Sequence, residues 1–122
     1  MPRPIRTRRV CCLPRDKKFG PLNPGVTKRP SLQMLVDEFE SIRLLDYEGL
    51  KQEEAAVYMN VTRTTVTAIY ESARKKMAQA LIEGLPLEIK GGHFHLYDEN
   101  EQRQIGCHWR HHRRLNETPE DK

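Results

Sequence analysis

Apolar residues recur with helical spacing through the second half of the chain. Positions three or four apart carry apolar side chains at Val66, Ile69, Ala73, Met77 and Ala80. This spacing puts them on one face of a helix. Thr62 is a good N-cap, because its hydroxyl can accept a hydrogen bond from the first turn. Gly84 and Pro86 end the helix.

A shorter helix is predicted directly before it, over residues 52–59. Glu53 and Glu54 fall in its first turn, where the helix dipole favours acids. Asn60 then stands at a turn that needs a positive φ, which Asn tolerates better than most residues. Two helices joined by so short a turn are typical of a helix-turn-helix. The alternative is a plain pair of core helices.

A supporting helix is predicted over residues 32–47. Its buried stripe is Val36, Phe39, Ile42 and Leu44 or Leu45. The acids Asp37, Glu38 and Glu40 lie in or near its first turn, where the helix dipole favours negative charge, and this explains them without a catalytic role. Gly49 provides a left-handed C-cap.

Residues 85–97 alternate apolar and polar side chains around Gly91-Gly92, a pair suited to a two-residue turn. The pattern predicts a β-hairpin over residues 86–97 that packs on the helical core. In that register Ile89 opposes Phe94 and Leu87 opposes Leu96. A short strand over residues 10–13 is a candidate third strand of the same sheet.

The two ends of the chain lack the apolar periodicity of residues 31–97 and differ from them in composition. Residues 1–30 are basic and rich in proline, and residues 98–122 are polar and rich in His and Arg. We expect both to be flexible tails around a mainly α domain, with the helix-turn-helix over residues 31–84. Arg8 and Arg9 belong to the basic arm, which either lies along phosphates or is simply solvated.

Composition narrows the classes of function. The 122 residues carry a net charge of +4, which suits a polyanionic partner. No apolar run is long enough to span a bilayer, and the basic start lacks the apolar core of a signal peptide, so we expect a cytoplasmic protein without a membrane partner. We expect no enzyme, because no phosphate loop, nucleophile elbow or paired-carboxylate arrangement stands out.

The predicted long helix opens with residues suited to a major groove. Arginine reads guanine edges, and short side chains allow close approach to bases. The candidate DNA-contacting residues at its start are Arg63, Thr64, Thr65, Thr67 and Ala68. Arg74 and Lys75, further along, are candidates for phosphate contacts.

Val61-Thr62-Arg63 with Val66, Ile69 and Ala73 resembles the helix-turn-helix of region four of the housekeeping sigma factors. More specific motifs occur in the order Met1-Pro2-Arg3-Pro4, Arg8-Arg9-Val10, Phe19-Gly20-Pro21, Asp37-Glu38-Phe39-Glu40-Ser41-Ile42-Arg43-Leu44, Glu48-Gly49-Leu50, Gln52-Glu53-Glu54 and Ser72-Ala73-Arg74-Lys75-Lys76. Together they resemble a small prokaryotic family of uncharacterised, predicted DNA-binding proteins, over residues 1–97.

This resemblance implies a fold and DNA binding but no target. By the sigma pattern, Arg63, Thr64, Thr67 and Ala68 approach base edges. Thr64 and Ala68 depart from the sigma factors, which carry longer polar residues there. A promoter element read by sigma is therefore not the expected target.

Cysteine and histidine residues offer a second kind of site. In a cytoplasmic protein the three cysteines are expected to be reduced thiols or metal ligands. Zinc or another transition metal could be held by Cys11, Cys107, His108 and His111. The sequence lacks the paired CxxC motif that is common in zinc sites. The predicted DNA binding requires no cofactor. The alternative is a buried cysteine beside a solvated basic tail.

Two functions remain after these exclusions. The first is a sequence-specific protein for double-stranded DNA that regulates transcription, with a homodimer as one arrangement. The second is a protein-interaction or RNA-binding module related to sigma region four, for which contact with RNA polymerase is one role.

Overall fold

The computed structural model describes residues 7–25 and 28–98. Within them lie the strands β1 (Arg8–Val10), β2 (Lys18–Phe19), β3 (Leu32–Met34), β4 (Leu87–Ile89) and β5 (Phe94–Leu96). The helices are α1 (Val36–Ile42), α2 (Gln52–Met59) and α3 (Arg63–Glu83). A π-helical turn, η2 (Arg43–Tyr47), continues α1.

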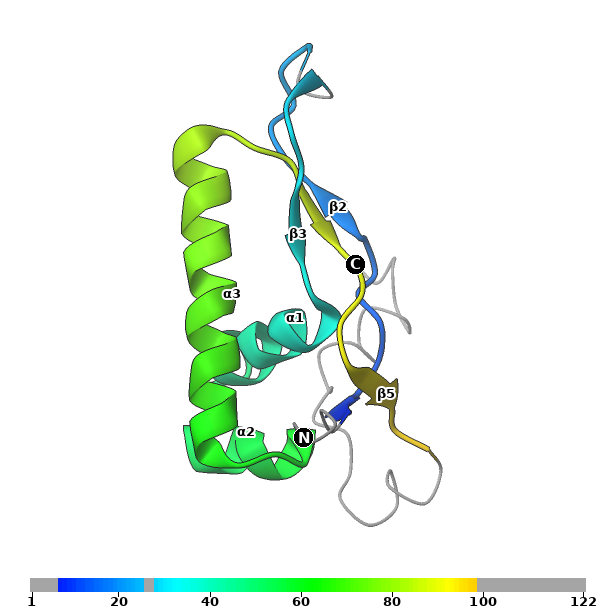
Figure 1. Cartoon of the computed structure of the whole chain (residues 1–122), viewed down its shortest axis with the longest axis vertical. Coiled ribbons are helices and arrows are strands. Elements are labelled where there is room, and N and C mark those ends of the chain that lie inside the picture. The colour runs from blue at the N-terminus through cyan, green and yellow to red at the C-terminus, as the bar shows by residue number, and fades with distance from the viewer. Residues whose placement is uncertain (1–6, 26–27, 99–122) are drawn as a thin grey trace, which may run out of the picture.

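The helices and strands occupy different sides of the molecule. Figure 1 shows α3 as a long column on one side and the strands on the other, with α2 beside the start of α3. The expectation of a mainly α domain is thus only partly confirmed, because the strands form two small sheets. The described part of the predicted basic arm contributes a strand to each sheet.

The predicted hairpin is wrong, although its strands and its turn exist. Gly91 and Gly92 have positive φ values of 79° and 104°, as a tight turn requires. However, β4 lies between β2 and β3, so both of its edges are already paired. β5 pairs instead with β1, in parallel, with Arg8 opposite Phe94 and Val10 opposite Leu96. The predicted third strand over residues 10–13 is also wrong in its bounds, because β1 spans Arg8–Val10 and joins β5 without joining β4.

The helix predicted over residues 32–47 begins later than expected, at Val36. Residues 32–34 form β3, which runs parallel to β4 with Leu32 opposite Leu87 and Met34 opposite Ile89. Leu32 and Met34 turn toward the core while Gln33 stays exposed, which is the alternation of a strand. The end of the helix is close to the predicted one, since Gly49 has a φ of 79°.

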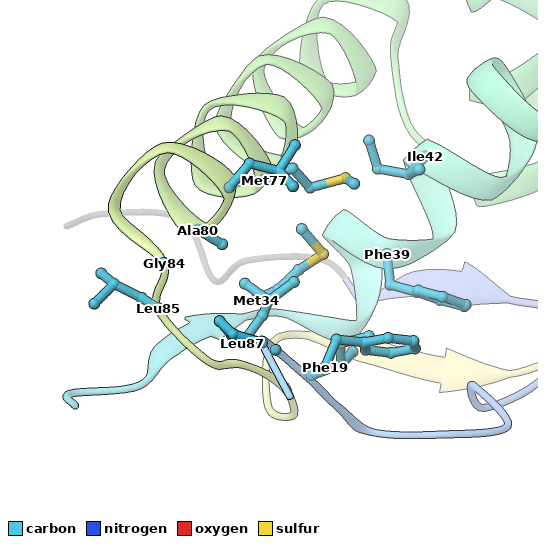
Figure 2. Close-up of a pocket in the computed structure, with 13 residues that line it drawn as sticks. Phe19, Met34, Phe39, Ile42, Met77, Ala80, Gly84, Leu85 and Leu87 are labelled. Carbon is cyan, nitrogen blue, oxygen red and sulfur yellow. The ribbon is translucent and has the colours of Figure 1, made fainter. Parts of the chain in front are cut away.

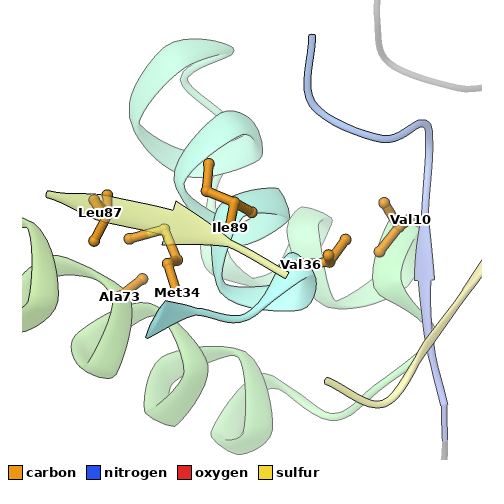
Figure 3. Packing of buried hydrophobic residues seen from close by; sticks show 6 residues of the cluster. All are labelled: Val10, Met34, Val36, Ala73, Leu87 and Ile89. Carbon is orange, nitrogen blue, oxygen red and sulfur yellow. The ribbon is translucent and has the colours of Figure 1, made fainter. Parts of the chain in front are cut away.

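Two groups of buried apolar side chains stabilise the fold. One group joins the sheet side to α1 and α3, and Figure 3 shows its members Val10, Met34, Val36, Ala73, Leu87 and Ile89. The other joins η2, α2 and the first half of α3, through Leu44, Ala55, Ala56, Met59, Val66 and Ile69. α3 contributes to both and so connects them.

Acidic side chains of α1 are buried and act as internal anchors. Glu38 accepts hydrogen bonds from Ser72 Oγ at 2.6 Å and Lys76 Nζ at 2.8 Å, which ties α1 to α3. Glu40 is fully buried and pairs with Arg43, with 2.7 Å between Nη2 and Oε2. Such charges are tolerated inside a protein only when they are paired. The acids therefore hold elements together, beyond their expected role at the helix start.

None of the helices in the described ranges is long and apolar enough to cross a bilayer.

Candidate nucleic-acid interface

The turn between α2 and α3 has the geometry that its sequence predicts. Asn60 adopts the left-handed conformation with φ 59° and ψ 47°, and it caps the end of α2. Two residues later, Thr62 Oγ1 accepts a hydrogen bond from the backbone N–H of Thr65 at 3.2 Å. Both the predicted turn and the predicted N-cap are confirmed. They fix the direction in which α3 leaves the turn.

Small side chains let α2 and α3 pack closely. Ala55 is fully buried and Ala56 nearly so, and both lie in the same apolar group as Val66 and Ile69. Burying this face of α3 leaves its opposite face in solvent. The start of α3 is thereby held rigidly by its neighbour while it remains accessible.

The predicted DNA-contacting residues at the start of α3 fall into two groups. Arg63, Thr64 and Ala68 are exposed on the surface of α3. Thr65 and Thr67 are half-buried, and their hydroxyls are engaged within the fold. Thr65 Oγ1 lies 3.0 Å from the Thr62 hydroxyl, and Thr67 Oγ1 lies 3.0 Å from the Arg63 carbonyl and also contacts the Gln52 side chain.

Two exposed arginines of α3, Arg63 and Arg74, have acidic neighbours. Arg63 Nε lies 3.7 Å from Glu53 Oε2, and both side chains are about two-thirds exposed at 64% and 67%. A pair this exposed is held weakly, so the guanidinium can exchange the carboxylate for another acceptor.

Further along the helix, Arg74 lies over the Tyr70 ring at 5.4 Å and 3.6 Å from Asp46 Oδ2. Tyr70 donates to Asp46, and this hydrogen bond is the main cause that raises the pKa of the tyrosine. Lys75 is exposed. Of the two cations predicted to contact phosphates, Lys75 would therefore not have to leave an acidic partner among the described residues first, whereas Arg74 would have to leave Asp46.

Arg8 and Arg9 are bound within the fold. Arg8 Nε lies 3.5 Å from Asp37 Oδ2, and both side chains are largely buried. Burial raises the pKa of Asp37, and the charge of Arg8 opposes that rise. Arg9 donates from Nη2 to the Val57 carbonyl at 2.7 Å, at the end of α2. Both arginines thus join β1 to the helices, a role that sequence reasoning did not assign to them.

The predicted metal site receives no support from the described residues. Cys11 is buried and disulfide-bonded, so the expectation of a reduced thiol or a metal ligand is wrong for this residue. Cys12 is a free thiol whose pKa is raised by burial. Cys107, His108 and His111 lie outside the described residues. Within residues 7–25 and 28–98, no group of three or more Cys, His, Asp or Glu side chains could hold a metal ion.

Comparison with known proteins places the chain among similar sequences of unassigned function. A family described as "Protein of unknown function DUF134" matches residues 1–97. A UPF0251 protein of Desulfitobacterium hafniense strain Y51 is 52% identical over 98 residues, which cover 80% of this chain and 78% of the relative. A UPF0251 protein of Thermoanaerobacter pseudethanolicus is 40% identical over 111 residues, which cover 91% and 94% of the two chains. No solved structure matches the chain.

Proposed function

The chain belongs to the DUF134 family of uncharacterised prokaryotic proteins, and we propose that it is a sequence-specific double-stranded DNA-binding protein that regulates transcription. The start of α3 enters the major groove in this proposal. The observation that carries it is the exposed Arg63, Thr64 and Ala68 face directly after the Asn60 turn.

Arg63 is the residue proposed to read a base. It stands in the first turn of α3, and its guanidinium can donate two parallel hydrogen bonds to the O6 and N7 atoms of guanine. Its pairing with Glu53 is exposed and is therefore easily exchanged for a base edge. Thr64 and Ala68 leave room for a close approach and offer apolar contact with a thymine methyl.

Phosphate contacts are assigned to Lys75 and Arg74 on the same helix. Arg74 is 63% exposed, even though Asp46 lies beside it. Arg8 and Arg9 are not needed for the proposal, because both are used to hold β1 in place. Positive charge on one surface of α3 favours the DNA backbone without selecting a sequence.

The first experiment selects bound duplexes from a random pool and compares the Arg63→Ala variant with the wild type on the selected site. Loss of a bidentate guanine contact should cost about 1–3 kcal/mol and relax the choice at one base position. Lys75→Ala is the matched control, because it removes one exposed charge from the same helix. It should weaken selected and random duplexes alike.

Equal losses on both duplexes for Arg63→Ala would contradict base reading by this side chain. If folded wild-type protein binds neither duplex at low salt, the DNA-binding proposal fails. Single-stranded RNA and heparin at matched salt complete the comparison, since preference for RNA would favour the interaction or RNA-binding module.

The salt dependence tests the N-terminal cations separately. Truncation must stop before β1, because deleting Arg8 and Arg9 would also remove contacts within the fold. Removing residues 1–6 takes away Arg3 and Arg6. If both neutralise phosphates, the slope of log K against log salt should become shallower by about 2. An unchanged slope would show that these two arginines do not contact phosphates.

A further inference from the structure

The second half of α3 exposes a row of apolar side chains. Met77, Leu81 and Ile82 are 38%, 78% and 84% exposed. Ala78 is also exposed, so apolar positions 77, 78, 81 and 82 form a continuous ridge on the helix surface. Single exposed apolar residues are common on proteins, but a cluster of them usually marks a surface that another molecule covers.

A groove lies next to this ridge. It has a volume of about 520 Å³ and lies between α3, the sheet and α1, with Phe19, Met34, Phe39, Met77, Leu81 and Leu87 among its lining residues. Figure 2 shows Met77 and Ala80 of α3 on one side of it and Phe19 and Leu87 on the other. None of the described residues that line the groove has a charged side chain.

We propose that this ridge and groove form the interface of a homodimer, in which a second copy of the chain occupies the groove. A two-fold axis makes the same surface contact itself, so a face that carries both a ridge and a neighbouring groove can be self-complementary. Under that symmetry the Leu81 ridge of each copy enters the groove of the other.

The exposed apolar area fits an interface of ordinary size. Phe19 is 50% exposed, and with Met77, Leu81 and Ile82 it offers on the order of 250 Å² of apolar surface. A standard interface buries about 800 Å² on each partner, of which roughly 450 Å² is apolar. These four side chains supply about half of that apolar area, and the groove walls supply more.

A small molecule fits these observations less well than a second copy. Ligand pockets usually include polar groups that orient the ligand, and the lining of this groove provides no charged side chain to do so. Ile82 also lies outside the groove lining, so a ligand bound there would leave this side chain in water. A second copy covers both the groove and the ridge.

The interface leaves the start of α3 free. Leu81 follows Arg63 by eighteen positions in one continuous helix, which corresponds to about 27 Å along its axis. The homodimer therefore does not depend on the proposed DNA binding, and neither proposal requires the other to hold.

Sedimentation equilibrium of the full chain tests the dimer, over about 1–100 µM protein. The wild type should shift from monomer toward dimer as its concentration rises. Leu81→Glu and Ile82→Glu should raise the dissociation constant at least about tenfold, because a carboxylate would be buried in an apolar interface. Val57→Glu is the matched control. It adds the same charge at an apolar residue of α2 that is 61% exposed and lies outside the ridge and the groove, so it should leave the dimer intact.

Folding of each variant is checked by circular dichroism, and Ile82 is exposed enough that its replacement should not unfold a monomer. A wild type that stays monomeric over the whole range would overturn the proposal. So would a dimer that survives both Leu81→Glu and Ile82→Glu. A monomer that still binds DNA specifically would remove the dimer and leave the proposed function standing.

Discussion

The two halves of α3 are one continuous helix with opposite surfaces. The first half buries Val66, Ile69 and Ala73 and exposes Arg63, Thr64 and Ala68. The second half exposes the apolar residues Leu81 and Ile82. The first half follows the usual division into a buried apolar face and a solvated polar face, whereas the second departs from it. Similar apolar content in a helix can therefore stabilise the fold at one end and offer a binding surface at the other.

The largest expected effect comes from replacing one isoleucine in each half of α3, one buried and one exposed. Ile69 is 8% exposed and Ile82 is 84% exposed. Ile69→Ala should lower the free energy of unfolding by about 2–5 kcal/mol, because it leaves a cavity between α2 and α3. Ile82→Ala should change it by less than about 0.5 kcal/mol in dilute protein. Urea denaturation followed by circular dichroism measures both, and equal losses would contradict the comparison.

The Asn60 turn sets how the first half of α3 packs. Its φ of 59° suits Asn or Gly and is strained for Ala. Asn60→Ala should therefore destabilise the fold by about 1–2 kcal/mol, measured by the same urea denaturation. Asn60→Gly is the control and should stay within roughly 0.5 kcal/mol of the wild type. If the two variants lose the same stability, the Asn60 side chain matters for another reason than its backbone conformation.

The N-cap of α3 contributes a somewhat smaller effect. Thr62→Ala removes the acceptor for the Thr65 N–H and should cost about 1 kcal/mol in thermal or urea unfolding. Thr64→Ala changes an exposed position in the same turn and should have an effect below about 0.5 kcal/mol. A Thr64→Ala loss as large as that of Thr62→Ala would show that the cap is not what stabilises this end.

The smallest expected effect concerns the charge next to Arg63. Glu53→Gln removes an exposed partner of Arg63 and an acid from the first turn of α2, and it should lower the free energy of unfolding by less than about 1 kcal/mol. Under the proposed function it should strengthen binding to a random duplex roughly twofold, because a negative charge beside the backbone is lost. Fluorescence anisotropy at low salt measures the gain. Weaker binding by a folded Glu53→Gln variant would indicate that Glu53 orients Arg63 for DNA.

Local signals explain which parts of the structure could be predicted. The bounds of α2 and α3 depend on Asn60, Thr62 and Gly84, whose conformations are set by neighbouring residues. The exposure of Arg63 and Ala68 follows from the helical spacing of Val66 and Ile69. These features need no knowledge of distant contacts.

The pairing of the strands depends on contacts between residues far apart in the sequence, so local patterns could not predict which strands are neighbours. Gly91 and Gly92 have the predicted positive φ, but β4 and β5 find partners elsewhere in the chain. A local alternation pattern identifies a strand without identifying its neighbour. The roles of Arg8 and Arg9 were missed for the same reason, since their acceptors lie on α1 and α2.

The burial of Glu40 follows from the apolar spacing of its helix. Val36, Glu40 and Leu44 are four residues apart and are all buried, so Glu40 lies in the apolar stripe of its helix. An acid in such a stripe needs a buried partner, and Arg43 one turn later provides it. The apolar spacing alone could therefore have separated Glu40 from an ordinary solvated acid.

The parallel pairing of β1 with β5 has a consequence for synthesis of the chain. Arg8 pairs with Phe94, so β1 leaves the ribosome long before its partner strand exists. The helices α1, α2 and α3 are all made in between, and they pack on one another. Closing a loop of this length is entropically costly, so we expect β1–β5 pairing to follow assembly of the helices. Before β5 is made, β1 can already contact α1 and α2 through Arg8 and Arg9, and its pairing with β5 then joins the two ends of the described chain.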